Sequence, residues 1–185
     1  MPLPQNNIRY TYADYLSWDD GERWELIDGI PYAMSPAPTP IHQEISVNLT
    51  LQIGAFLKNK PCRLYTAPFD VRLNADEKDD TVLQPDLSVV CDPSKINETG
   101  CIGAPDFVIE IISPSTARRD RMVKLKQYQQ AGVREYWIVD PDTKTVQVCI
   151  LEGARYFTSV YADTDIMPVT VLPGCEVVLA DVFDV

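Results

Sequence analysis

The chain has 185 residues, 45% of them hydrophobic, and carries a formal net charge of −11 at pH 7. This composition is typical of a globular protein of one domain and argues against disorder. No apolar run approaches ~18 residues, so no membrane-spanning helix is expected. The acidic balance argues against broad affinity for phosphate backbones, because proteins that hold nucleic acids non-specifically are usually basic.

The N-terminal part predicts a short helix followed by a hairpin. Thr11 can cap a helix over residues 12–16, and residues 24–34 have the pattern of a hairpin that turns at Asp28-Gly29. Thr39 and Pro40 are suited to begin a helix that ends near residues 59–61. An apolar stripe at helical spacing predicts that one face of this helix is buried.

Strands are predicted through the centre of the chain, over residues 63–73, 81–83 and 86–91. Pro85 marks the last of these as a strand entry, a bulge or an edge position. Residues 107–112 are apolar nearly throughout, as expected of a central strand that is covered on both faces.

A helix over residues 117–131, ended by Gly132, is followed by a strand over 135–140. Residues 144–150 and 155–161 are expected to form a hairpin, and two further short strands, 169–172 and 176–179, close the chain. The strand–helix–strand unit indicates an α/β (α+β) architecture with a mixed sheet.

The cysteines and the N-terminus point to a compartment. Five cysteines are scattered and form no Cys-x-x-Cys pair, and His42 is the single histidine, which argues against a zinc finger. Free thiols in a reducing cytoplasm are the simplest interpretation. Residues 1–7 lack the basic start and apolar stretch of a secretory leader, so we expect a cytoplasmic protein.

Three charged residues carry the functional prediction. Glu110 lies inside the apolar run 107–112, where a carboxylate is costly unless it is paired or holds a metal. Asp86 stands at the mouth of a strand that can be its neighbour. Lys124 shares a helical face with Asp120 and Tyr128, and it can reach both acids if that face meets the sheet.

Such a site has a clear chemical use. Two carboxylates and a backbone carbonyl form an oxygen cage suited to magnesium or manganese. The metal polarises a phosphodiester and lowers the pKa of a bound water, and a nearby lysine stabilises the developing charge.

Plainer interpretations stand beside this one. Asp86 can cap a turn, and Asp120 with Lys124 can be an ordinary ion pair worth about 0.2–0.5 kcal/mol. The basic stretch 118–126 can be a solvated helix face. Tyr128 can belong to the core.

Several motifs resemble the Uma-type endonuclease family, which is common in cyanobacteria. The resemblance covers nearly the whole chain and rests on motifs at residues 24–29, 42–43, 85–86, 108–116, 120, 124, 128 and 132–141. It implies a restriction-endonuclease-like core with a mixed central sheet flanked by helices, plus extra β-hairpins. A domain over 1–185 would divide into an appendage (1–40), a nuclease core (41–141) and C-terminal hairpins (142–185).

The resemblance also implies residue roles. Asp86, Glu110 and the carbonyl of Ile111 would hold the metal, and Lys124 would be the catalytic lysine. The general signature of the superfamily has a lysine two residues after the second acid, where this chain has an isoleucine; the family supplies the lysine from the following helix. Glu25 and His42 match family positions near the site, although a structural role is an alternative for His42.

The resulting hypothesis is magnesium- or manganese-dependent hydrolysis of DNA phosphodiesters, with no membrane partner. A homodimer is expected because cutting both strands of a duplex requires two sites. A nuclease fold that serves as a binding or assembly module without turnover is the alternative, favoured by the charge of −11 and the displaced lysine. A two-carboxylate glycosidase is a weaker third hypothesis, since it leaves Lys124 without a role.

Overall fold

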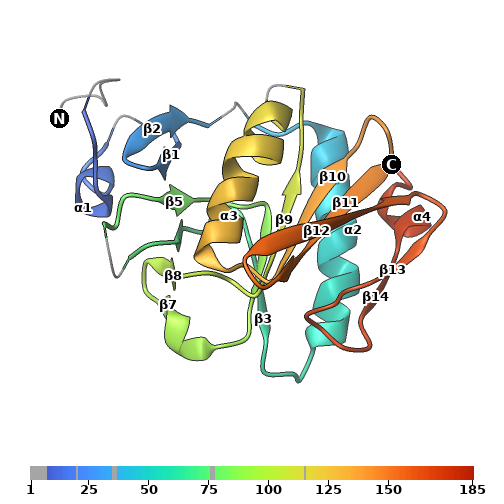
Figure 1. Cartoon of the computed structure of the whole chain (residues 1–185). Helices are drawn as coiled ribbons and strands as arrows, with labels where there is room; N and C mark the ends of the chain where they lie inside the picture. The colour runs from blue at the N-terminus through green and yellow to red at the C-terminus, as the bar shows by residue number, and fades with distance from the viewer. Residues whose placement is uncertain (1–7, 20, 35–36, 76–77, 115) are drawn as a thin grey trace.

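The computed structural model describes residues 8–19, 21–34, 37–75, 78–114 and 116–185 (Figure 1). The expectation of no leader rests on residues 1–7, which lie outside these ranges. No helix within them is both long enough and apolar enough to span a bilayer.

The described strands form two six-stranded sheets and a two-stranded ribbon. The first sheet has the order β2-β1-β5-β4-β8-β7, and the second has the order β12-β11-β10-β9-β6-β3. The first sheet comprises β1 (Trp24–Ile27), β2 (Ile30–Ala33), β4 (Val71–Arg72), β5 (Val82–Leu83), β7 (Ile96–Asn97) and β8 (Gly100–Ile102). The second comprises β3 (Arg63–Thr66), β6 (Leu87–Val90), β9 (Phe107–Ile111), β10 (Glu135–Asp140), β11 (Thr145–Glu152) and β12 (Arg155–Ala162), and the ribbon comprises β13 (Ile166–Pro168) and β14 (Glu176–Val178).

The second sheet is mixed, which confirms the predicted fold class. Strand β9 runs parallel to β10, with Glu110 paired to Ile138, and antiparallel to β6, with Ile109 paired to Leu87. The helical elements are α1 (Tyr12–Tyr15), α2 (Pro40–Leu57), η1 (Pro93–Lys95), η2 (Arg119–Lys124), α3 (Leu125–Ala131) and α4 (Leu179–Val182).

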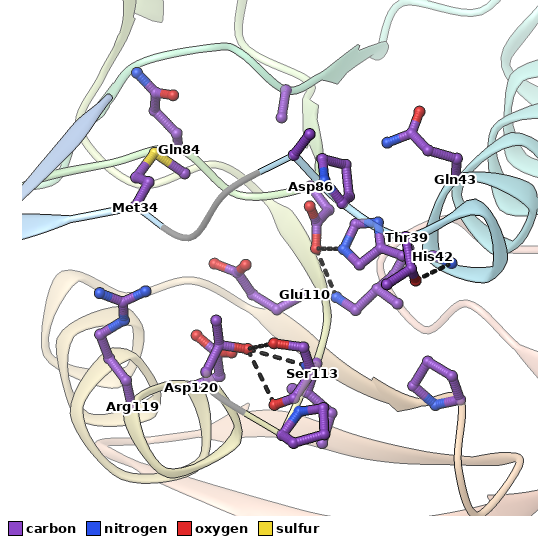
Figure 2. Close-up of a pocket in the computed structure, with 18 of the residues that line it drawn as sticks. Met34, Thr39, His42, Gln43, Gln84, Asp86, Glu110, Ser113, Arg119 and Asp120 are labelled. Carbon is purple, nitrogen blue, oxygen red and sulfur yellow. Dashed lines mark hydrogen bonds and ion pairs between the residues drawn. The ribbon is translucent and has the colours of Figure 1, made fainter. Parts of the chain in front are cut away.

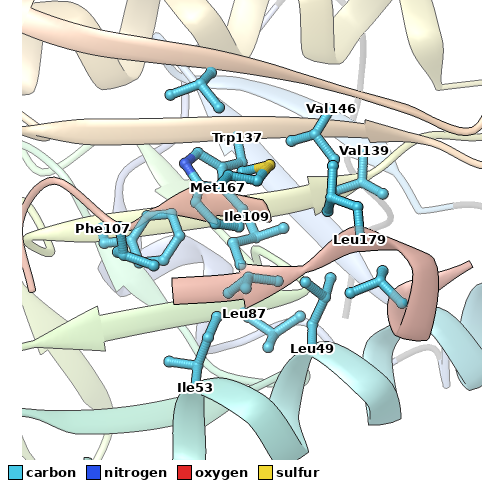
Figure 3. Close-up of a cluster of buried hydrophobic side chains, with 14 of the residues drawn as sticks. Leu49, Ile53, Leu87, Phe107, Ile109, Trp137, Val139, Val146, Met167 and Leu179 are labelled. Carbon is cyan, nitrogen blue, oxygen red and sulfur yellow. The ribbon is translucent and has the colours of Figure 1, made fainter. Parts of the chain in front are cut away.

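Helix α2 forms where its cap and apolar stripe predict it. The Thr39 hydroxyl accepts the backbone N–H of His42 at 3.3 Å, and Pro40 takes the first helical position. The buried stripe of α2 packs on one face of the second sheet, against Phe107, Ile109 and Trp137 (Figure 3). This stripe consists of Ile45, Leu49, Ile53 and Leu57.

The helix predicted over 117–131 covers the opposite face and begins at residue 117, as predicted, but its winding changes. Residues 117 and 118 are α-helical, η2 is a π-helical turn, and regular α-helix resumes at Leu125. Gly132 ends it with φ +89°, a left-handed conformation that glycine adopts without strain. The hairpin turns at Asp28-Gly29 and Gly153 are also as predicted.

The end of the chain differs from the prediction. Residues 169–172 form a turn instead of a strand, closed by the Leu172 N–H donating to the Val169 carbonyl at 3.0 Å. The N–H of Val171 donates to the buried Glu135 carboxylate at 2.9 Å, so it is not available for a strand ladder. Leu179 begins α4 instead of ending a strand, because its apolar side chain is buried by helix packing against α2.

The prediction that all five cysteines are free thiols is wrong for two of them. Cys62 and Cys91 form a disulfide, whereas Cys101, Cys149 and Cys175 are free and buried. Cys62 precedes β3 and Cys91 follows β6, and the neighbouring pair is Arg63 opposite Val90. Antiparallel pairing therefore brings two residues 29 positions apart in the sequence face to face, which spacing alone does not reveal.

Candidate active site

A cavity of about 670 Å³ opens beside the N-terminus of α2 and the end of β9 (Figure 2). Six segments contribute charged side chains to its wall: β1 with the residue before it, the start of α2, the entry to β6, β9, η2 and the turn after β10. These side chains are Arg23, Glu25, His42, Asp86, Glu110, Arg119, Asp120, Lys124 and Asp142. All five residues to which the sequence assigned roles through their side chains therefore line one cavity.

Asp86 lies where β6 meets β9. Its Oδ2 accepts the backbone N–H of Ile111 at 2.7 Å and lies 3.2 Å from Nε2 of His42. The side chain is 20% exposed, so it faces the cavity instead of being enclosed. These contacts cross from one strand to the next, and the carboxylate is therefore more than a local turn cap.

Glu110 is buried and fully engaged on one oxygen. Its Oε1 accepts from Lys124 Nζ at 2.9 Å and from the Tyr128 hydroxyl at 2.8 Å. The Lys124 ammonium also lies 2.7 Å from Glu25 Oε1 and 3.6 Å from Asp120 Oδ1. Lys124 of η2 therefore contacts Glu110 of β9, and this lysine is only 3% exposed.

These contacts determine the protonation of the cluster. Burial raises the pKa of Glu110 well above 4.5, opposed by the Lys124 charge and reinforced by the neighbouring acids. Burial likewise raises the pKa of Asp120. Burial alone would lower the pKa of Lys124, but the charges of Glu110, Glu25 and Asp120 outweigh it and raise that pKa. Lys124 is therefore a permanent cation at neutral pH.

Glu25 enters the site from the other sheet. It is completely buried on β1, and its Oε1 also accepts the backbone N–H of Gln84 at 3.2 Å. Its Oε2 has no hydrogen-bond partner among the described residues, and neither have Oδ1 of Asp120 and Nε of Arg119. Arg119 Nε lies 3.9 Å from Glu25 Oε2. Buried polar atoms usually have a hydrogen-bond partner. Three buried atoms that have ion-pair neighbours but no hydrogen bond are therefore candidates for contact with a ligand.

His42 points toward the site from the first turn of α2. Burial lowers the pKa of its imidazole, but the hydrogen bond and charge of Asp86 and the Ile111 backbone outweigh burial, so the pKa is raised. The side chain is 15% exposed and is absent from the apolar core. His42 therefore does not continue the buried stripe of α2.

The donor chemistry fits a hard cation. In the described part of the chain no three histidine, cysteine or acidic side chains lie close enough together to form a metal cluster. However, Asp86 and Glu110 face the same cavity, and the oxygens of Glu25 and Asp120 that accept no hydrogen bond belong to the ligand class that magnesium prefers (Figure 2). The site therefore fits magnesium if a backbone carbonyl, such as that of Ile111, completes the ligand set.

Three residues of the site had a plainer interpretation in the sequence. Arg119 belongs to the basic stretch that was assigned to a solvated face, Asp120 was an ion-pair partner, and Tyr128 was a core residue. The spacing of Asp120, Lys124 and Tyr128 was the usable signal, because all three are buried on one side of the helix. Arg118 and Lys126 are exposed, so the plain interpretation does hold for them.

Comparison with known proteins supplies the relationship. The model of the Uma2 family, described as "Putative restriction endonuclease", matches residues 12–181. The chain belongs to this family. An uncharacterized protein of Synechocystis is 32% identical over 117 residues, which cover 62% of this chain and 60% of the relative. The chain thus spans less than two thirds of the length of this curated relative.

A solved structure shares the fold of this Uma2 member. The protein described as "a putative nuclease belonging to DUF820" from Anabaena variabilis aligns with a TM-score of 0.75. The alignment covers 94% of this chain and 97% of the other, at 24% sequence identity. At this identity the similarity establishes a shared fold and nothing further.

Proposed function

We propose that this protein is a metal-dependent DNA endonuclease that hydrolyses phosphodiester bonds in the cavity. The observation that carries the proposal is the buried contact of Lys124 with Glu110 and Glu25, on the wall of the cavity that Asp86 also faces. A buried lysine among three acids is expensive to maintain for stability alone, since replacing a whole buried ionic cluster with apolar residues is often neutral or stabilising. Family membership supports the same reaction class.

The metal would be magnesium or manganese, held by Asp86, Glu110 and the Ile111 carbonyl. When bound, the ion supplies polarisation of the phosphodiester and a more acidic water. Lys124 and Tyr128 both bond to Oε1 of Glu110, which fixes the carboxylate and leaves Oε2 for a cation. His42 and the Ile111 N–H fix Asp86 in the same way, so we assign His42 a positioning role.

Arg119 is the residue best suited to hold the substrate phosphate. Its side chain is 19% exposed at the cavity wall, and its buried Nε has no hydrogen-bond partner among the described residues. A planar guanidinium matches phosphate oxygens with paired, charge-assisted hydrogen bonds. Arg119 and Lys124 together would offset the local effect of a chain charge of −11.

The direct test is cleavage of supercoiled and linear DNA by the purified protein with magnesium or manganese at low salt. We expect cleavage, and we expect Asp86→Asn to lose it at least ~100-fold, as removal of one electrostatic contact in a site does. Asp184→Asn is the matched control, because it makes the same substitution at an exposed residue next to the C-terminus. DNA that stays intact under all these conditions would contradict the proposal that this protein is a nuclease.

The alternative is a nuclease fold that binds or assembles without turnover, and the net charge favours it. Metal binding separates the two. Calorimetric titration with manganese should give a site in wild type that Glu110→Gln removes, with circular dichroism confirming that the variant is folded. A melting temperature that does not change with divalent ions, together with no heat of manganese binding, would favour the binding module.

Three further expectations accompany this proposal. A cytoplasmic location was expected from two sequence features, the free thiols and the pattern of residues 1–7. The Cys62–Cys91 disulfide removes the first of these arguments. The division at residues 1–40, 41–141 and 142–185 is a prediction that limited proteolysis can test. A homodimer would supply one site for each DNA strand.

A further inference from the structure

One edge of the second sheet is open. Strand β12 is the outermost strand, and it crosses the front of the molecule in Figure 1. Residues 157–160 are all exposed, including the apolar Phe157 at 59% and Val160 at 66%. Residues 156–162 carry no charge in a chain in which 23% of residues are charged. An uncharged, exposed edge strand of this length is a template for pairing with another strand.

The backbone of β12 is regular and its unpaired groups can be located. All eight residues pair with β11 in continuous register, without a bulge. The N–H of Tyr156 donates to the Gln129 side chain at 3.0 Å, and that of Ala162 donates to Asp165 at 2.8 Å, so both point away from β11. Because direction alternates along an antiparallel strand, Thr158 and Val160 also turn their N–H and C=O groups outward.

The other described sheet edges are protected. Strand β3 has four residues, begins at Arg63 and is tied to β6 by the Cys62–Cys91 disulfide. Strand β2 contains Pro31, and β7 has only two residues. Short length, charge and proline are the usual ways of blocking edge pairing, and β12 has none of them between residues 156 and 162.

The sequence of β12 is complementary to itself. If two copies pair antiparallel about Ser159, Thr158 lies opposite the partner's Val160, and the outward backbone groups of both residues meet. In the same register Phe157 faces the partner's Tyr161. Arg155 lies near the partner's Asp163, the first residue of the turn that follows β12, and the two-fold axis repeats each contact. Aromatic and opposite-charge cross-strand pairs stabilise a sheet.

We propose that β12 is a self-association surface, on which a second copy of this chain pairs edge to edge and joins two six-stranded sheets into one. Two eight-residue strands bury less than the ~800 Å² per partner of a standard interface. The association is therefore concentration-dependent and of modest affinity. Neither the nuclease reaction nor the metal enters this proposal.

Sedimentation velocity over a wide concentration range tests the proposal. Wild type should shift from the chain mass of 20.8 kDa toward twice that mass as concentration rises. Val160→Lys should remain a monomer, because its charge stands at the pairing edge. Leu51→Lys, at a site of similar exposure on α2, should behave like wild type. A wild-type monomer at every concentration, or a dimer that survives Val160→Lys, overturns the proposal.

A charge exchange tests the register independently. Arg155→Glu and Asp163→Arg should each weaken the dimer by about tenfold, because two charge pairs at the ends of the interface change from attraction to repulsion. The double variant should recover the wild-type dissociation constant. If each single variant dissociates but the double variant does not recover, the register about Ser159 is wrong. Circular dichroism confirms folding, and the readout is mass, so a result here is independent of any DNA cleavage.

Discussion

The two faces of β9 differ in what they bury. Phe107, Ile109 and Ile111 alternate onto the face covered by α2 and join a hydrophobic cluster there. Glu110 points to the opposite face, between Val108 and Ile112, where α3 and the first sheet enclose it with Lys124. One strand therefore contributes stability on one side and candidate chemistry on the other. Substitutions on the two faces should separate stability from metal binding.

The largest effect on stability is expected on the apolar face. Trp137 on β10 is fully buried, stacks edge-to-face on Phe107 and donates to Glu135 at 2.8 Å. Trp137→Ala should lower the free energy of unfolding by about 4 kcal/mol, from lost burial and the cavity left behind. Urea unfolding measures this. The manganese affinity of the folded fraction should be unchanged, and its loss would show that the faces are not independent.

Removing the buried cation is expected to cost nearly as much on the polar face. Lys124→Met leaves Glu25, Glu110 and Asp120 without their shared counter-ion, which should cost about 3–4 kcal/mol at neutral pH. The cost should decrease as pH falls, because the raised pKa values of Glu110 and Asp120 allow these acids to protonate. Lys126→Met, an exposed position on the same helix, is the control. A loss that does not depend on pH would contradict this assignment.

The disulfide should contribute a similar amount. Cys62 and Cys91 lie 29 positions apart, and in the chain-entropy model closing a loop of this length stabilises the fold by about 3.6 kcal/mol. Replacing both with serine should lower the free energy of unfolding by this amount, measured in urea under oxidising conditions. Wild type with a reductant should match the double variant. Equal stability of all three samples would indicate that the bond does not form in the protein.

The smallest effect is expected for Glu110→Gln. Folding raises the pKa of Glu110, so ionisation of this carboxyl is disfavoured in the folded protein. Its contribution to the free energy of unfolding is therefore lost as pH rises from 4.5 through the folded-state pKa. The amide removes this dependence, so the variant should be within about 1 kcal/mol of wild type at neutral pH. Unfolding measured across a pH series checks both the size and the slope. Manganese binding should be lost all the same.

The central elements were predictable because local and tertiary signals agree there. The stripe of α2, the nearly apolar β9 and Gly132 each have one physical interpretation, and the structure confirms them. The meeting of Glu110 and Lys124 followed from the same reasoning, since a buried carboxylate requires a partner and the next helix offered one.

The rest depended on contacts between distant segments. Glu25 could be placed only by resemblance, because β1 reaches the site through the order of the first sheet. Arg119 was hidden in a basic stretch whose neighbours are solvated, and local spacing cannot show which of several cations faces inward. The turn at 169–172 depends on the Glu135 carboxylate, a partner 36 positions from Val171.

The π-helical turn η2 has a consequence for how the lysine reaches the strand. A π-turn holds one residue more than an α-helical turn in the same span, so it fixes the rotation of every later side chain about the helix axis. Deleting a single exposed residue there, such as Met122, would convert the turn to regular helix of the same span, so Asp120 and Lys124 would both keep their places. A regular helix that kept every residue would instead rotate Lys124 by about 100° about the helix axis, away from the strand. The length of that turn thus sets whether the amine and the strand carboxylate can meet at all.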